Sequence, residues 1–288
     1  MDVYTLNELH LIASTGRTAT NFIAHCLNQI DGVTATHEGQ IDGDKSSSPL
    51  LPLINIENST MYRTPSHAIH VVAEKRGVEQ ISAIGVEEGG KVAVDVAYYN
   101  TPMAQAYLRH HEWARGIGII REAAGFVRSA SHITGEDILP VGWPDSGKPL
   151  TAREKFISFG RIRPRPGTPE AKVWAEWDTI QKNIWLWRES NNLLLDTRDE
   201  FPDRFTIVEF EKLVDKPDIF WLEVATALNI TLPENFGLIL ESARRYQNKK
   251  KSGYQVPDAS EWPEIHRAML TQAKIKIKER WLNGKSSG

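Results

Sequence analysis

The stretch that decides the fold is LHLIASTGRTATNFIAHCL, residues 9–27. An apolar run from Leu9 to Ala13 predicts a buried strand, and apolar residues at helical spacing from about Asn21 onward predict a helix. Small and hydroxyl residues lie between them, around a single arginine, Arg17. A tight turn from a strand into a helix leaves free backbone N–H groups, and the helix dipole adds positive potential to them. The stretch therefore predicts a binding site for an anionic group, with an ordinary capped helix as the alternative.

Composition limits the class of protein. The chain has 288 residues, 41% of them hydrophobic, which is enough for a sizeable core. With 34 basic and 37 acidic side chains the net charge is −3, so no global field favours nucleic acid or an anionic membrane, and any bound anion must be held locally. The start of the sequence has no secretion signal, and no segment approaches the about 18 apolar residues of a membrane helix. We therefore expect a cytoplasmic protein that acts without a membrane.

Strands and helices alternate along the chain. Apolar, β-branched runs predict strands at 9–13, 33–36, 81–86, 91–98, 116–120 and 205–210. Apolar residues at helical spacing predict helices near 22–30, 103–111, 173–191, 218–228, 234–246 and 261–282. Several strands are nearly continuous in apolar residues, as in sheets covered on both faces. The pattern predicts an α/β fold with a central, mainly parallel sheet flanked by helices.

Two long segments rich in glycine, proline, serine and charge interrupt this pattern, at 39–60 and 139–170. Long irregular segments in compact domains are usually functional or disordered. We interpret them as substrate loops or lids, with disorder as the alternative. Strands that belong to one sheet lie on both sides of each segment, so the chain is expected to form a single domain over residues 1–288.

The first turn differs from the phosphate loop of ATPases and GTPases. That loop reads GxxxxGK[ST], whereas residues 14–21 (STGRTATN) contain neither a second glycine nor a lysine. An NTPase also needs a hydroxyl and a carboxylate for Mg²⁺, and the sequence shows no convincing acidic strand end for that role. A P-loop kinase or NTPase is therefore the less favoured function.

A second strand-to-helix junction reads GIGIIREAAGFVRSASH, residues 116–132. Arg121 closes the predicted strand and Ser129 follows two helical turns later, so the two side chains can grip one phosphate from two sides. The two motifs together resemble the superfamily of sulfotransferases that use 3′-phosphoadenosine 5′-phosphosulfate (PAPS). Members carry a PxSGTT loop after the first strand, to which GRTATN (16–21) is similar, and an arginine–serine pair at the spacing of Arg121 and Ser129.

Two weaker motifs extend this resemblance to about residue 254. FTIVEFEKLVDKP (205–217) resembles the family's strand that ends in YEDLxxxP, with Phe210 in place of the tyrosine. RRYQNKKKSGY (244–254) resembles the basic loop that closes on the cofactor, although a solvated charge run is nearly as good an interpretation. Each motif is loose, but their order along the chain is more specific than any one of them.

The resemblance implies a P-loop-like sulfotransferase fold that binds PAPS, releases its desulfated product PAP and needs no metal. Two departures from the family pattern bear on the site. Ala19 replaces a glycine, and its Cβ is tolerable if φ stays negative. Phe210 lacks the tyrosine hydroxyl, which leaves packing or stacking as its role. The resemblance implies cofactor contacts from Thr15, Gly16, Arg17, Thr18, Ala19, Thr20, Asn21, Arg121, Ser129, Phe210, Lys249, Lys250 and Lys251.

The catalytic candidates are Arg17, Glu38 and His37. The resemblance implies that Arg17 stabilises negative charge on the leaving phosphate. It also places Glu38 at the position where related members, including the tyrosylprotein enzymes, carry a catalytic glutamate. Glu38 is therefore the predicted base, with His37 as the alternative base and a solvated strand end as the non-functional interpretation. His67 is expected to line the acceptor pocket together with Glu38.

The expected function is transfer of a sulfuryl group to a hydroxyl or amine of a small molecule, such as a natural product. A non-catalytic nucleotide-binding protein of the same fold is a further alternative. Two other features are expected to be structural. The single cysteine, Cys26, is expected to be a buried thiol, and Trp174, Trp177, Trp185 and Trp187 are expected to pack in the core.

Overall fold

The computed structural model describes residues 8–37, 92–131, 161–243 and 256–285. Within these ranges the strands form one sheet in which each neighbouring pair is parallel. This confirms the predicted α/β class, and the strand expected at 81–86 lies outside the described residues. The strands, in the spatial order β2-β3-β1-β4-β5, are β1 (Glu8–Ser14), β2 (Val33–His37), β3 (Val92–Val96), β4 (Gly116–Ile120) and β5 (Phe205–Glu209).

The central strand is β1. It pairs with β3 on one side, where Glu8 lies opposite Val92, and with β4 on the other side, where Leu11 lies opposite Gly116. The chain leaves β1 toward β2 at one edge and later returns to add β4 on the opposite side. Ligands of open parallel sheets bind outside the carboxyl ends of the strands where the connections diverge in this way. The topology therefore directs attention to the carboxyl end of β1.

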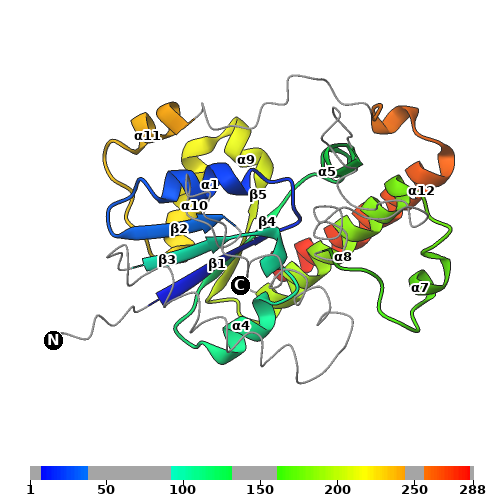
Figure 1. Cartoon of the computed structure of the whole chain (residues 1–288), viewed down its shortest axis with the longest axis horizontal. Helices are drawn as coiled ribbons and strands as arrows, with labels where there is room; N and C mark the ends of the chain where they lie inside the picture. Colours follow the sequence, from blue (N-terminus) through cyan, green and yellow to red (C-terminus); the bar gives the residue numbers. More distant parts are fainter. Residues whose placement is uncertain (1–7, 38–91, 132–160, 244–255, 286–288) are drawn as a thin grey trace, which may run out of the picture.

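Helices connect the strands and cover both faces of the sheet (Figure 1). Helix α1 (Thr20–Leu27) follows β1, and α5 (Ala123–Ser131) follows β4. After β3 come the 3-10 turn η1 (Tyr98–Asn100) and helix α4 (Ala104–His110). The later helices are α7 (Pro169–Val173), α8 (Thr179–Glu200), α9 (Phe210–Asp215), α10 (Pro217–Leu228), α11 (Phe236–Ala243), the 3-10 turn η3 (Ala259–Glu261) and α12 (Glu264–Lys285).

The two faces of the sheet have separate hydrophobic clusters, because successive strand residues point to opposite faces. Ile12 of β1 packs in the cluster that includes α1 and α10, whereas the preceding Leu11 packs with Tyr107 of α4. Cys26 of α1 is fully buried in the first cluster, as predicted. Burial raises the pKa of its thiol to about 12, so the thiol stays protonated at neutral pH.

The pattern from Val173 to Asn191 predicts one continuous helix, and this prediction is wrong. Helix α7 ends at Val173 and α8 begins at Thr179. Asp178 caps α8: its side chain accepts a hydrogen bond of 2.9 Å from Gln181 N, and the Gln181 side chain accepts one of 3.1 Å from Asp178 N. This reciprocal capping box satisfies two backbone donors and fixes the start of α8.

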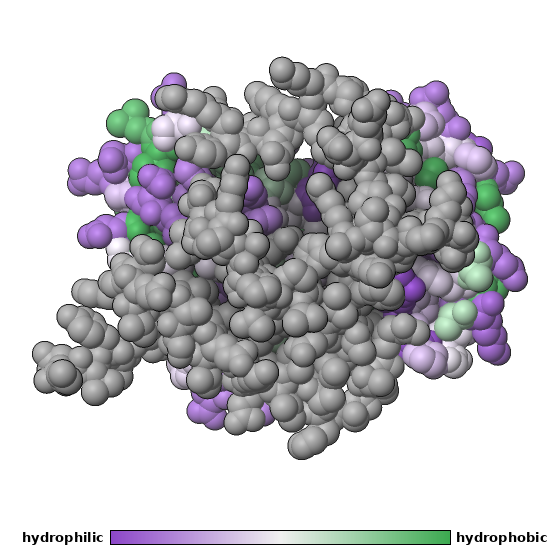
Figure 2. All heavy atoms as spheres, viewed as in Figure 1, coloured by the Kyte–Doolittle hydropathy of each residue, from purple (hydrophilic) through white to green (hydrophobic). Residues whose placement is uncertain are grey.

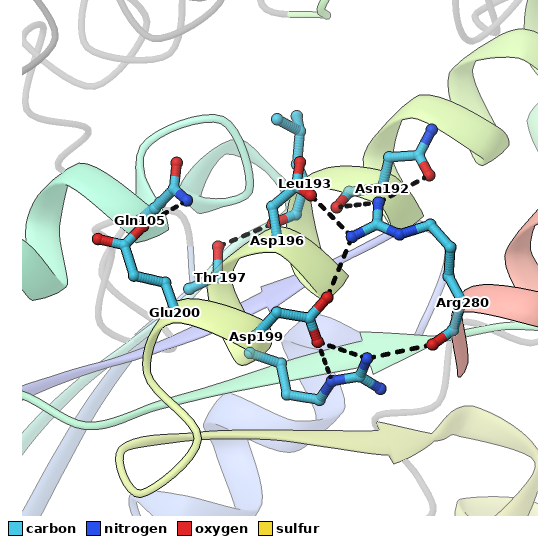
Figure 3. A network of polar contacts seen from close by, with 9 residues as sticks. Gln105, Asn192, Leu193, Asp196, Thr197, Asp199, Glu200 and Arg280 are labelled. Atoms are coloured by element: carbon cyan, nitrogen blue, oxygen red, sulfur yellow. Dashed lines mark hydrogen bonds and ion pairs between the residues drawn. The ribbon is translucent and has the colours of Figure 1, made fainter. Parts of the chain in front are cut away.

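Helices α8 and α12 lie side by side along one edge of the molecule (Figure 1). Figure 3 shows the polar network between them, which is centred on Arg280 of α12. The Arg280 guanidinium donates to Asp196 Oδ1 at 2.7 Å, to Asn192 Oδ1 at 3.1 Å and to Asp199 Oδ2 at 3.3 Å. The network fixes the C-terminal helix against α8, the helix that also packs on α5.

The tryptophans pack as predicted. Trp185 and Trp187 of α8 are buried, and Trp174 and Trp177 pack against the same cluster. The rings of Trp174 and Trp185 meet edge to face, with centroids 5.2 Å apart. The indole nitrogen of Trp187 donates to the carbonyl oxygen of Arg121 at 2.8 Å, so this core residue also supports the second motif.

Arg204, just before β5, closes the carboxyl end of α4. Its guanidinium donates to the carbonyl oxygens of Leu108 and His111 at 2.9 Å and of Glu112 at 3.0 Å, and lies over the Phe201 ring at 4.8 Å. The last carbonyl groups of a helix have no partner within it, and a cation near them also suits the helix dipole. Arg204 therefore connects α4 to the amino end of β5.

Apolar side chains interrupt the hydrophilic surface in places, as the green areas of Figure 2 show among the described residues. Within the part of the chain that the structure describes, no helix is long and apolar enough to cross a membrane. The large apolar side chains that stay exposed lie mainly on α9 to α12, and are Trp113, Val214, Ile219, Leu222, Leu238, Ile265, Ile275 and Leu282.

Candidate active site

The turn after β1 has an unusual backbone. Gly16, Arg17 and Ala19 have φ angles of 89°, 58° and 56°. The condition under which the Cβ of Ala19 is tolerable, a negative φ, is not met, and a left-handed alanine costs about 1–2 kcal/mol. Alternation between left- and right-handed residues gathers successive N–H groups into a concave anion-binding surface. The turn therefore has the backbone shape of an anion site, at the carboxyl end of the central strand.

The base of this turn is held by its neighbours. Gly16 N donates to Ser14 Oγ at 3.0 Å, and Thr15 N donates to the carbonyl of Ile119 in β4 at 3.1 Å. The Thr101 hydroxyl accepts from Ser14 N at 3.1 Å and donates to Ser14 O at 2.7 Å. A Cβ on Gly16 would come within 3.2 Å of the Tyr98 ring, so this position needs glycine for space as well as for its φ.

The amino end of α1 suits an anion. Ala19, at the N-cap, has no polar side chain to accept from the first N–H groups, and the first turn contains no acidic residue. The Thr18 hydroxyl is fully buried, and no group lies within hydrogen-bonding distance of it among the described residues. Donors without acceptors at a positive helix end favour a negatively charged ligand.

The two sequence motifs meet at this edge of the sheet. Arg17 Nε donates to Ser129 Oγ of α5 at 3.0 Å. The Arg121 guanidinium donates to the carbonyl oxygen of Arg17. The predicted partners Arg121 and Ser129 thus both bind the Arg17 residue. Two guanidinium groups and a helix amino end then lie around one turn.

Phe210 takes part in the same arrangement. The Arg121 guanidinium carbon lies 4.9 Å from the centre of the Phe210 ring, within range of a cation–π contact. Phe210 is the first residue of α9, directly after β5. The Phe210 ring thus stacks on the Arg121 guanidinium and also packs against the cluster that includes α1 and α10.

The amino end of α5 differs from that of α1, because carboxylates already occupy it. Glu122 Oε2 accepts from Gly125 N at 2.7 Å, and Glu211 Oε1 accepts from Glu122 N at 2.8 Å. An anion at this junction must therefore be held by the Arg121 side chain, not by the helix end. The sequence reading missed both glutamates. Glu122 was predictable as a capping residue, because acidic residues are common at the start of a helix. Glu211 was not, because it comes from a distant segment of the chain.

His37 is the last residue of β2, so it lies at the carboxyl end of the strands, as the Arg17 turn does. A hydrogen bond of 3.0 Å joins its Nε2 to Thr20 Oγ1, at the start of α1. His37 is thus connected to the anion turn. The other predicted site residues, Glu38, His67, Lys249, Lys250 and Lys251, lie outside the described residues.

The structure contains one acidic strand residue beside β1 that the sequence reading did not single out. Asp95 of β3 is buried, with Oδ1 accepting from the Thr36 hydroxyl at 2.7 Å and Oδ2 accepting from Asn100 Nδ2 at 2.9 Å. It lies on the face of the sheet that also carries Ala93, beneath α4. Both oxygens serve the fold, so Asp95 does not supply the free carboxylate that the NTPase alternative requires.

No protein-family model matches the chain, and no curated protein matches it. Solved structures are similar over most of the length. A sulfotransferase domain from the curacin biosynthetic pathway has 10% identity and a TM-score of 0.48, covering 92% of this chain and 96% of the other. Sulfotransferase STF1 from Mycobacterium tuberculosis H37Rv has 10% identity and a TM-score of 0.48, covering 92% of this chain and 76% of the other.

A sulfotransferase from Alicyclobacillus acidocaldarius has 12% identity and a TM-score of 0.47, covering 94% of this chain and 92% of the other. Likeness at this level concerns the arrangement of strands and helices, and it does not transfer residue roles. All three of these solved structures are named as sulfotransferases.

Proposed function

We propose that this chain is a sulfotransferase that moves the sulfuryl group of PAPS to a hydroxyl or amine of a small molecule. The observation that carries the proposal is the hydrogen bond between Arg17 and Ser129, together with the bond from Arg121 to the Arg17 carbonyl. These contacts join two motifs 112 positions apart into one cationic group. A nucleotide with anionic groups at both its 3′ and 5′ positions needs adjacent binding groups of this kind. We propose that residues 1–288 form one such domain.

The described residues fit an anionic cofactor. The buried Thr18 hydroxyl lacks a partner among them, and the amino end of α1 has no acidic neighbour in its first turn. PAPS, when bound, would supply a sulfuryl group attached to a phosphate leaving group. We propose that Thr15–Asn21 hold its 5′ end, and that the 3′-phosphate is held by Arg121 and Ser129, beside Phe210, and by Lys249, Lys250 and Lys251.

Arg17 is proposed to stabilise the negative charge that grows on the leaving phosphate oxygen. Ser129 fixes the Arg17 side chain through Nε, and Arg121 fixes its carbonyl oxygen. Donors that are oriented before the reaction do not need to reorganise during it, and one such donor contributes about 10²–10³-fold in rate. The two guanidinium groups would thus supply the positive charge that Mg²⁺ supplies in phosphoryl transfer.

Glu38 is proposed to take the proton of the acceptor. It directly follows His37, the last residue of β2, and the carboxyl ends of parallel strands meet at one edge of the sheet. That edge also holds the Arg17 turn, which supports Glu38 as a group close to the transferred sulfur. His37 is the alternative base, and we propose that His67 and the segments 39–60 and 139–170 contribute to the acceptor pocket.

The first test is Glu38→Gln, assayed with radiolabelled PAPS against a panel of small hydroxyl and amine acceptors. Loss of the base should lower turnover by about 10²–10⁴-fold while leaving the affinity for PAP nearly unchanged. Glu234→Gln, at an exposed position on the segment before α11, is the matched control. Turnover that survives Glu38→Gln within a few-fold would assign the base to another residue.

The second test is Arg121→Ala, measured by calorimetry with PAP. Removal of a charged hydrogen-bond donor should weaken PAP binding by about tenfold to a hundredfold. Arg128→Ala, on helix α5 that follows Arg121, is the control, because the Arg128 guanidinium forms an ion pair of 2.6 Å with Asp258. Unchanged PAP affinity in Arg121→Ala would refute the 3′-phosphate role, and binding of ATP in preference to PAP would favour the NTPase alternative.

A further inference from the structure

The hydrogen bond between Thr20 and His37 links two strand ends through the anion turn. Thr20 Oγ1 lies 3.0 Å from His37 Nε2, and both residues are half-buried. Thr20 is the first residue of α1, next to the left-handed Ala19, and His37 ends β2. The Thr20 hydroxyl therefore lies where a ligand of the turn and His37 compete for it.

The Thr20 hydroxyl has one proton to donate and two lone pairs that accept. If His37 Nε2 is unprotonated, Thr20 gives its proton to the histidine and presents only lone pairs to an anion. If Nε2 is protonated, His37 donates to Thr20, and the threonine proton points toward the ligand. Only the second arrangement makes Thr20 a donor to an oxyanion.

We infer that His37 is a positioning residue that donates from Nε2 to Thr20 when the turn holds an anionic ligand. The ligand thereby selects the Nε2-protonated form of His37, and Thr20 becomes one of its hydrogen-bond donors. This inference rests on the proposed function in one respect, since the turn must bind an anion. It also separates the two neighbouring residues: His37 orients the turn through Nε2, and Glu38 receives the acceptor proton.

The first test is a double-mutant cycle measured by calorimetry with PAP. Thr20→Val should weaken binding by about tenfold because it removes the donor, and His37→Leu by a similar factor because the Thr20 proton is then no longer directed toward the ligand. The double variant should bind no more weakly than either single variant, since the two changes act on one interaction. His37→Gln, whose amide nitrogen can donate in place of Nε2, should restore the affinity to within about threefold of the unchanged protein.

Two controls separate this role from loss of structure. His110→Leu changes an exposed histidine of α4 and should leave PAP affinity unchanged. Thermal unfolding of each variant shows whether the fold is retained. Losses of affinity that add in the double variant, or a His37→Leu protein that binds PAP normally, would overturn the positioning role.

The second test observes the proton directly. Nitrogen-15 spectra of histidine-labelled protein separate protonated from unprotonated ring nitrogens, and the His37 signals are identified by their loss in His37→Gln. Addition of PAP should move Nε2 to the protonated position, and in Thr20→Val this change should be absent or much smaller. A His37 ring that keeps an unprotonated Nε2 in the PAP complex would overturn the inference.

The same titration with inorganic pyrophosphate separates this inference from the proposed function. If Nε2 becomes protonated when pyrophosphate is added and PAP does not bind, the link between His37 and the turn stands and the PAPS assignment fails. If PAP binds with the expected affinity but Nε2 stays unprotonated, the PAPS assignment stands and the link fails. If neither ligand changes the His37 signals, the inference is overturned.

Discussion

Ala19, the N-cap residue of helix α1, has a left-handed backbone and an exposed side chain. Its Cβ costs about 1–2 kcal/mol in this conformation, while glycine would add entropy to the unfolded chain. We expect Ala19→Gly to raise the free energy of unfolding by about 0.5–1 kcal/mol, measured by urea unfolding. Ala268→Gly, at an exposed position inside α12, should do the opposite and lower it by up to about 1 kcal/mol. A destabilised Ala19→Gly protein would show that the alanine side chain makes contacts that outweigh the strain.

The sequence predicts which residues form the turn, but not their partners. Small and hydroxyl residues around Arg17 indicate an anion site because those residue types expose backbone donors. The contact of Arg17 with Ser129 depends on how β1 and β4 pair, and no local pattern contains that information. The Tyr98 ring, which leaves room only for glycine at position 16, also comes from a distant segment and is not part of the local pattern. Whether Glu38 completes the site stays a prediction.

At the scale of single elements, helix α4 depends on a residue from outside it. Arg204 donates to carbonyl groups at and after the end of α4. Arg204→Met keeps the apolar stem but removes these bonds, and we expect the free energy of unfolding to fall by about 1–3 kcal/mol in urea titrations. Arg165→Met, at an exposed position, should have little effect. Arg204 lies at the amino end of β5, opposite the candidate site, so the affinity for PAP should not change. If Arg204→Met unfolds at the same urea concentration as the unchanged protein, water replaces the guanidinium at no cost.

Elements with strong apolar periodicity are predictable to within a residue or two, and this holds for β1, β3, β4 and β5. The break between α7 and α8 is not visible in the apolar spacing, because Trp177 and Ile180 continue the helical repeat across it. Its cause is the polar signal of Asp178 with Gln181, which competes with the apolar one. Capping residues therefore deserve the same weight as periodicity where the two conflict.

At the scale of the whole molecule, the buried histidine of the central strand makes stability depend on pH. Burial, aided by Arg115, lowers the pKa of His10 from 6.5 to about 4. As the pH falls, the unfolded chain therefore binds a proton at His10 at a higher pH than the folded protein does. The contribution of neutral His10 to stability is full above pH 6.5 and is lost progressively between 6.5 and about 4. We expect a loss of about 2 kcal/mol at pH 5 from this group. Urea unfolding at pH 7 and pH 5 should show a smaller loss for His10→Gln, and an equal loss in both proteins would contradict the assignment.

The fold class was predictable as a whole, whereas the arrangement of the strands was not. Continuous apolar strands that alternate with helices imply a parallel sheet with both faces covered, and this is what forms. The order β2-β3-β1-β4-β5 depends on which strand edges meet, and the apolar pattern of one strand does not specify its neighbours. The α8–α12 pair is held by Arg280 and its acidic partners, which lie on helices far apart in the sequence.

The position of β1 at the centre of the sheet has a consequence during synthesis on the ribosome. Its residues emerge before those of its partner strands, which begin at Val92 and Gly116. Pairings between such distant segments are slow to form and leave an apolar strand without partners in the meantime. A nascent chain that stops before Arg121 already contains every residue of the anion turn and the Thr101 and Ile119 groups that hold its base, but it lacks Arg121 and Ser129, which bind Arg17. Ligand affinity should therefore arise late, as the growing chain completes the second junction, and this strand is the segment most in need of a chaperone until then.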